Sequence, residues 1–170
     1  SSAASDVYKR QSLDTTVIAQ ADLVAFYLPM HTATRIAVPL IERVRTLNPD
    51  AHLCCYGLYA PLNETFLRAV GVQTILGGEF ETGLVTLAKR LQGSTTAMIL
   101  PEQSISLTRQ HFQLPDRTDL PALQRYAFLD VGDGRQRTVG YTEATRGCKH
   151  HCRHCPIVPV YGGQFRIVQR

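Results

Sequence analysis

Residues 23–28 have the sequence LVAFYL, a short apolar run that Pro29 closes. An apolar run of this length, bounded by a proline, is typical of a strand that is buried on both faces. Residues 32–47 follow with apolar side chains at helical spacing, and Pro39 should kink this helix or mark a late start. A strand that leads directly into such a helix is the unit from which parallel sheets are built. The stretch therefore predicts the first unit of an α/β fold.

Two further units of the same kind follow along the chain. Strands are expected at residues 52–57 and 72–76, helices at 62–70 and 82–91, and a turn at Gly77-Gly78. Short connections of this kind favour a parallel sheet with right-handed crossovers. We expect residues 12–100 to form a partial doubly wound, Rossmann-type α/β domain. Its strand-end loops should share one rim, where glycines permit the close approach of a large ligand.

The flanking regions differ in composition from this domain. Residues 1–11 have low complexity and are interpreted as a non-native leader. Prolines without periodicity predict a linker over residues 101–135, and the residues beyond it are expected to begin a second domain with a strand at 138–142. The chain is interpreted as an internal fragment that lacks the first strand of its α/β domain.

Composition excludes several classes of protein. Of the 170 residues, 44% are hydrophobic and 19% are charged, which is typical of a folded domain and not of a disordered or collagen-like chain. No apolar run approaches the roughly 20 residues that a membrane-spanning helix needs. The opening residues also lack the apolar core of a signal peptide, so we expect no membrane partner and a cytoplasmic location.

Positive charge is concentrated at one end of the chain. Residues 1–134 carry a net charge of −2, whereas residues 135–170 carry +6 and also three cysteines and three histidines. A basic tail can bind nucleic acid, but few aromatic residues are interleaved with these cations, which makes nucleic acid an unlikely partner. The cysteines favour a site for an anionic cofactor or cluster.

The three tail cysteines are Cys148, Cys152 and Cys155, in a CxxxCxxC spacing. On a helix they would share one face, but Gly147 and Pro156 and the cationic residues between the thiols favour a loop. Three thiols in eight residues indicate a metal site. From the residues alone, the metal is either zinc, with a nearby histidine as fourth ligand, or an iron–sulfur cluster with one open iron.

The other two cysteines, Cys54 and Cys55, are interpreted as small core side chains. Because they are adjacent on a strand, their side chains should point to opposite faces of the sheet. Glu79 and Glu81 flank a predicted turn and are interpreted as charges at the start of a helix.

The cysteine loop, introduced by Glu143-Ala144-Thr145-Arg146-Gly147, resembles the signature of the radical S-adenosylmethionine superfamily. The resemblance implies that residues 136–170 begin a (β/α) barrel and that the three cysteines hold a 4Fe-4S cluster. The cluster would bind S-adenosylmethionine and cleave it reductively to a 5′-deoxyadenosyl radical, with electrons from a flavodoxin- or ferredoxin-like donor. His154 stands where the family has an aromatic residue near the adenine, which implies a cofactor-binding role.

The upstream α/β units resemble the cobalamin-binding domain that accompanies many enzymes of this superfamily, over roughly residues 15–95. The resemblance rests on the order of elements and on Gly77-Gly78-Glu79. It implies a cobalamin-assisted methyl transfer or rearrangement on a substrate that the sequence does not identify. Two alternatives stay open: an α/β domain that binds no corrin and acts as a scaffold, and a zinc-stabilised binding module with a Cys3His site.

Overall fold

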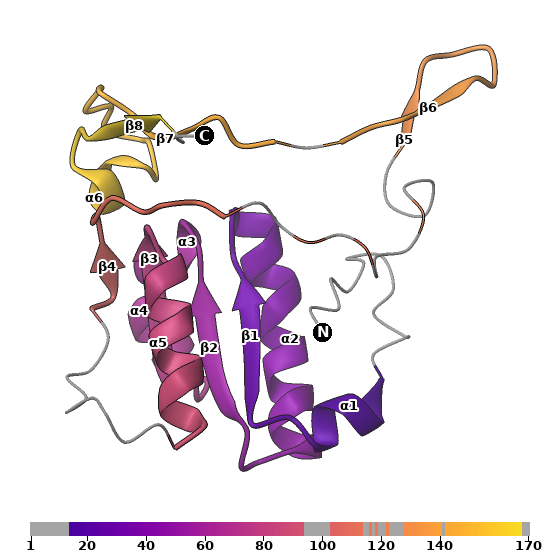
Figure 1. Cartoon of the computed structure of the whole chain (residues 1–170), viewed down its shortest axis with the longest axis vertical. Coiled ribbons are helices and arrows are strands. Elements are labelled where there is room, and N and C mark those ends of the chain that lie inside the picture. The colour runs from indigo at the N-terminus through magenta and orange to yellow at the C-terminus, as the bar shows by residue number, and fades with distance from the viewer. Residues whose placement is uncertain are drawn as a thin grey trace.

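The computed structural model describes residues 14–93, 103–113, 116, 118, 122, 128–140 and 142–167; the predicted leader lies outside them. Its centre is a four-stranded sheet in the order β1 (Leu23–Tyr27), β2 (His52–Tyr56), β3 (Thr74–Gly78) and β4 (Ile105–Ser106) (Figure 1). All three strand pairs are parallel. The predicted α/β class with a parallel sheet is therefore confirmed.

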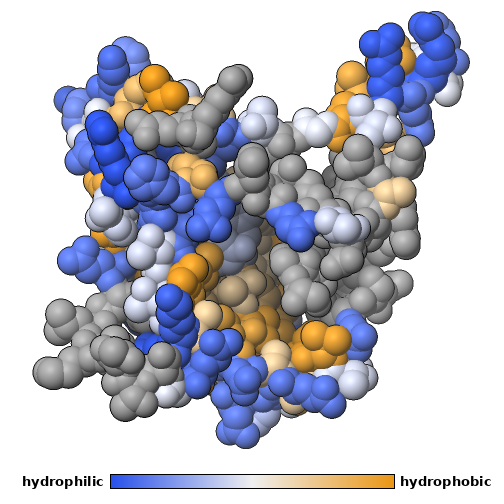
Figure 2. Space-filling view, viewed as in Figure 1, coloured by the Kyte–Doolittle hydropathy of each residue, from blue (hydrophilic) through white to orange (hydrophobic). Residues whose placement is uncertain are grey.

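Helices cover both faces of this sheet. On one face a core contains Ile41 and Val44 of α2 (His31–Leu47), Ala60 of α3 (Tyr59–Leu62) and Leu67 of α4 (Glu64–Ala69). On the other face Leu87 of α5 (Glu81–Leu91) packs against β2 and β3. Figure 2 shows apolar atoms in a recess beside α5, where β1 and β2 run in Figure 1. The arrangement is compatible with a partial doubly wound domain.

The helices differ in detail from the sequence-based prediction. Helix α2 begins at His31, so Pro39 lies inside it, on its exposed side, and does not mark a late start. The helix predicted at 62–70 is divided at Asn63, whose side-chain nitrogen donates to the Tyr59 carbonyl at 2.8 Å. An additional helix, α1 (Thr15–Ala19), begins after Asp14, whose carboxylate accepts from two backbone amides.

Strand β3 ends two residues later than predicted. Gly77 and Gly78, which the sequence indicated as a turn, are the last strand residues and pair with Ile105 and Ser106. A Cβ at Gly77 would lie 2.5 Å from Pro61 Cγ, so glycine allows the α3 segment to pack directly on the strand. The region predicted as a linker therefore contains β4, a short strand of the main sheet.

The later part of the chain forms two small antiparallel pairs. Strands β5 (Phe128–Asp130) and β6 (Gln136–Thr138) form a hairpin that projects from the molecule (Figure 1). Strands β7 (Thr145–Gly147) and β8 (Phe165–Ile167) form the second pair, and helix α6 (Val158–Tyr161) lies between them in the chain. No strand occupies described residues 139, 140 and 142, so the strand predicted at 138–142 is wrong. The described residues form no barrel. A (β/α) barrel is built from parallel strands joined by long crossovers, whereas β7 pairs antiparallel with β8.

No helix in the described ranges has both the length and the apolar character needed to cross a membrane. The longest of them, α2, has 17 residues and includes the charged residues Arg35, Glu42, Arg43 and Arg45. This result agrees with the absence of a long apolar run in the sequence.

The first prediction concerns the glycine at the end of β3. Gly78 has φ +67°, and a Cβ there would overlap the Ser106 carbonyl oxygen; Gly93 has φ +74° with open space around it. Gly93→Ala should cost roughly 1–2 kcal/mol for the left-handed backbone alone. Gly78→Ala should cost a further 1–3 kcal/mol, roughly, because β4 must shift. Urea unfolding of both variants measures the difference, and equal losses would contradict the β3–β4 pairing.

Candidate functional site

The cysteine loop lies between β7 and α6, within residues 143–167, which we call the cluster segment. Gly147 ends β7 with φ +74°, and a Cβ there would overlap the carbonyl oxygen of Gln164 and approach the Tyr161 ring at 2.8 Å. The next amide, that of Cys148, donates to the same carbonyl at 3.0 Å. The loop therefore leaves a strand, as predicted, but the strand is β7, and its partner β8 returns the chain to the same place.

Between Cys148 and Cys155 the chain is irregular and largely exposed. Cys152 and His154 are exposed, whereas Cys148 and Cys155 are partly buried. The amide of Cys155 donates to the Cys152 carbonyl at 3.2 Å, which forms a turn between the second and third cysteines. The predicted loop, as opposed to a helical cysteine stripe, is confirmed.

The three thiols share one loop but are not gathered around one point. Within the described residues, no group of three or more His, Cys, Asp or Glu side chains lies close enough to hold a metal ion. The donor set itself, three accessible thiols in eight residues with cations between them, has the chemistry of a thiolate-held iron–sulfur or zinc site. Metal binding would have to draw the thiolates together, since without a cation they repel one another.

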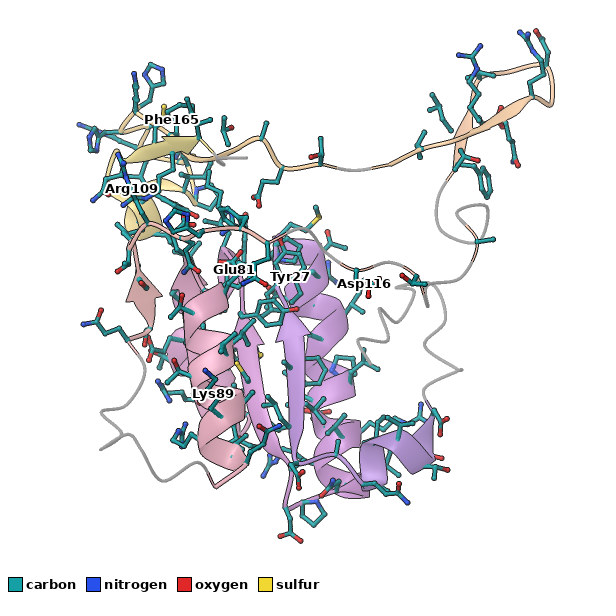
Figure 3. The ribbon with its side chains drawn as sticks, in the orientation of Figure 1. Tyr27, Glu81, Lys89, Arg109, Asp116 and Phe165 are labelled. Atoms are coloured by element: carbon teal, nitrogen blue, oxygen red, sulfur yellow. The ribbon has the colours of Figure 1, made fainter. Side chains whose placement is uncertain are left out.

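A buried arginine connects the cluster segment to the sheet. Arg146, in β7, forms ion pairs with Glu79 at the end of β3 (3.0 Å), with Glu81 at the start of α5 (2.5 Å) and with Glu143 (2.8 Å). Its side chain is only 10% exposed, and that of Glu79 only 3%. Figure 3 shows Glu81 at the end of α5 that faces the cluster segment. We call Arg146 and these three glutamates the Arg146 node.

Two aromatic rings enclose the guanidinium group of the node. The Arg146 guanidinium carbon lies 5.3 Å from the ring centroid of Phe80 and 4.9 Å from that of Phe112. Phe80 also contacts Tyr56 of β2, with ring centroids 5.0 Å apart. Cation–π contacts are strongest where water is excluded, which is the situation here. The node is thus a packed unit and not a surface ion pair.

Charge compensates for burial in the node. Burial disfavours the charged guanidinium, but the hydrogen bonds and negative charges of Glu81 and Glu143 outweigh it and raise the pKa of Arg146 above its ordinary value. Burial and the negative charge of Glu79 raise the pKa of Tyr161, which packs beside the node in α6. Both groups therefore keep their usual protonation state at neutral pH.

The loops after the parallel strands converge on one rim, as predicted. The Leu28 amide donates to the Tyr56 carbonyl at 2.7 Å, and the Gly57 amide donates to the Leu76 carbonyl at 3.0 Å. A Cβ on Gly57 would lie 2.9 Å from the Tyr27 ring. The space that this glycine leaves is therefore filled by the protein's own side chain, as is the space beside Gly77.

The remaining cysteines occupy the sheet core. Cys54 belongs to the core on the α5 side and Cys55 to the core on the α2 side, so the prediction of opposite faces is confirmed. Both are fully buried, and burial raises the pKa of the Cys55 thiol to about 12. Neither belongs to the cysteine loop, where the metal site is expected.

Sequence reasoning missed the Arg146 node. Glu81 does lie in the first turn of α5, as predicted, but its carboxylate and that of Glu79 are also the partners of an arginine 65 and 67 residues later. The available signal was weak: two acidic residues directly after a buried strand, and a lone arginine ahead of a cysteine loop.

Comparison of the chain with protein-family models, with curated proteins and with solved structures found no match.

The second prediction tests the Arg146 node. Arg146→Gln leaves the carboxylate of Glu79 buried without its cation, which should destabilise the protein by about 3–5 kcal/mol. Arg135→Gln is the control, because the Arg135–Asp133 pair is exposed and 3.9 Å long, and its loss should change stability by less than about 0.5 kcal/mol. Urea unfolding distinguishes the two variants. A loss at Arg146 no larger than the loss at Arg135 would show that the node is not buried in solution.

The third prediction concerns thiol reactivity. Iodoacetamide should alkylate Cys148, Cys152 and Cys155 in the folded protein, with exposed Cys152 the fastest, because reactivity follows exposure. Cys54 and Cys55 should react only after unfolding, since both are fully buried. Peptide mass spectrometry over a time course measures each site. Labelling of Cys55 at the rate of Cys152 in the folded protein would contradict the described core.

Proposed function

We propose that the cluster segment belongs to a radical S-adenosylmethionine enzyme in which the thiolates of Cys148, Cys152 and Cys155 hold a 4Fe-4S cluster. When bound, such a cluster supplies the electron that cleaves S-adenosylmethionine to a radical. The observation that supports the proposal most directly is the separation of thiols: all three residues of the CxxxCxxC spacing lie on one accessible loop, while the other two are buried in the sheet.

The chain's own residues have distinct roles under this proposal. Lys149 and Arg153 lie between the thiols and would offset the negative charge of a thiolate-held cluster. The loop begins directly after β7 and ends before α6, and the Cys148 amide at its start donates to the Gln164 carbonyl. His154 is exposed and would stack against the adenine of the cofactor. An external flavodoxin- or ferredoxin-like protein would deliver the electron.

For the α/β unit we propose the scaffold alternative over cobalamin binding. Gly57 and Gly77 at its rim are each packed against one of the protein's own side chains, Tyr27 and Pro61, so the small size of these glycines is explained without a corrin. The Arg146 node also joins this rim to the cluster segment. Supporting the cysteine loop is therefore the role that the contacts favour, and a purified protein that retains a corrin would contradict it.

The fourth prediction is the metal content of the protein. After anaerobic reconstitution with iron and sulfide, the chain should carry about four irons and four acid-labile sulfides. The triple variant Cys148→Ala, Cys152→Ala, Cys155→Ala should lose both. Cys54→Ala is the matched control, because it removes a buried thiol and should leave the iron and sulfide content unchanged.

Two further results complete the test. Adding S-adenosylmethionine to the reduced protein should change its paramagnetic resonance spectrum, because the cofactor would bind the iron that has no cysteine ligand. One zinc per chain without sulfide would contradict the proposal and support a zinc-stabilised binding module. Iron retained by the triple cysteine variant would contradict the assignment of these three ligands.

A further inference from the structure

A cavity of about 430 Å³ opens where the segment after β4 meets the cluster segment. Its lining includes Glu79 and Arg146 of the node, Arg109 and Phe112 after β4, and Phe165 and Arg166 of β8. Figure 3 shows Arg109 beneath Phe165 at this junction. The volume is in the range of cavities that bind small molecules.

Two buried polar atoms of this lining have no hydrogen-bond partner within the described part of the chain. They are Oε1 of Glu79, an acceptor, and Nε of Arg166, a donor. Glu79 as a residue is only 2% exposed. A buried polar atom without a partner costs roughly 1–3 kcal/mol, so a bound group that both accepts and donates would stabilise this pair of opposite type.

The charges of the lining indicate the nature of that group. Arg146 is paired with three carboxylates, so the Arg146 node as a whole carries a net charge of −2. In contrast, Arg109, Lys149 and Arg166 also line the cavity, and no ion pair to a carboxylate is present for them among the described residues. These three cations outweigh the charge of the node by one, which favours an anionic ligand, and three separate cationic side chains match the three acceptor oxygens of a phosphate ester better than the two of a carboxylate.

We propose that this cavity binds a small phosphate ester that carries a hydroxyl or amino group. Its phosphate oxygens accept hydrogen bonds from Arg166, Arg109 and Lys149, and its hydroxyl or amino group donates to Oε1 of Glu79. The remaining volume, beside Phe112 and Phe165, holds the organic part of the ligand. The proposal does not depend on the proposed function, since none of the three cysteines lines the cavity.

The test is calorimetric titration of the metal-free protein at pH 7 and constant ionic strength with three probes. Sulfate and inorganic phosphate have the same shape, but only phosphate retains an O–H group to donate to Glu79. Glycerol 3-phosphate adds an organic part with hydroxyl groups. Phosphate should bind at least about ten-fold more tightly than sulfate, as one extra hydrogen bond to a charged group implies, and glycerol 3-phosphate more tightly still.

Two variants locate the binding. Arg109→Gln should weaken glycerol 3-phosphate binding by about ten-fold or more, as expected for one charge-assisted hydrogen bond. Arg135→Gln, at an exposed cation in the turn of the β5–β6 hairpin and outside the cavity lining, should leave it unchanged. Any one of four results would overturn the proposal. Sulfate and phosphate could bind equally tightly, or the two variants could have equal effects. Glycerol 3-phosphate could bind no more tightly than inorganic phosphate, or no probe could bind at millimolar concentration. The triple cysteine variant should bind glycerol 3-phosphate as tightly as the parent chain does. Loss of the iron–sulfur cluster can therefore be distinguished from loss of binding in the cavity.

Discussion

The burial of one guanidinium group connects the two parts of this protein. Arg146 is almost enclosed, and a charge in such a place is stable only if opposite charges and hydrogen bonds replace the water that it loses. Glu79 directly after β3, Glu81 at the start of α5 and Glu143 shortly before β7 provide them. Since the first two lie at the carboxyl edge of the parallel sheet, the interaction holds the cysteine loop over that edge.

The position of the node depends on how the sheet is built. Strand β3 extends through Gly77 and Gly78 and pairs there with β4. Glycine is needed at both positions, because Pro61 and the β4 backbone lie too close for a side chain. The chain then turns at Glu79, which places this carboxylate at the strand end, and α5 begins at Glu81. The same extension brings β4 into the sheet, and the residues after β4 supply Phe112 to the node and Arg109 to the neighbouring cavity.

The five cysteines of the protein lie in two different environments. Cys54 and Cys55 pack in the sheet, and burial favours the neutral thiol of Cys55. Cys148, Cys152 and Cys155 lie on a largely exposed loop beside cations, where reagents and metal ions can reach their sulfur atoms. A loop that is bounded by β7 and α6, yet irregular between them, can rearrange its thiols around a cluster without disturbing the sheet.

The sequence alone determined those features that depend on neighbouring residues. Apolar runs and helical periodicity predicted β1, α2, β2 and α5 closely, and the CxxxCxxC spacing with Gly147 and Pro156 predicted the loop. Strand β4 escaped prediction because two residues among prolines carry no periodic signal, and β3 was misplaced because glycine also serves in turns. Only the tertiary structure revealed the antiparallel β7–β8 pair, the Arg146 node and the cavity beside it. These features depend on contacts between residues far apart in the chain, 67 positions in the case of Arg146 and Glu79. A local sequence pattern cannot specify them, because it does not show which distant charges pair when they are buried.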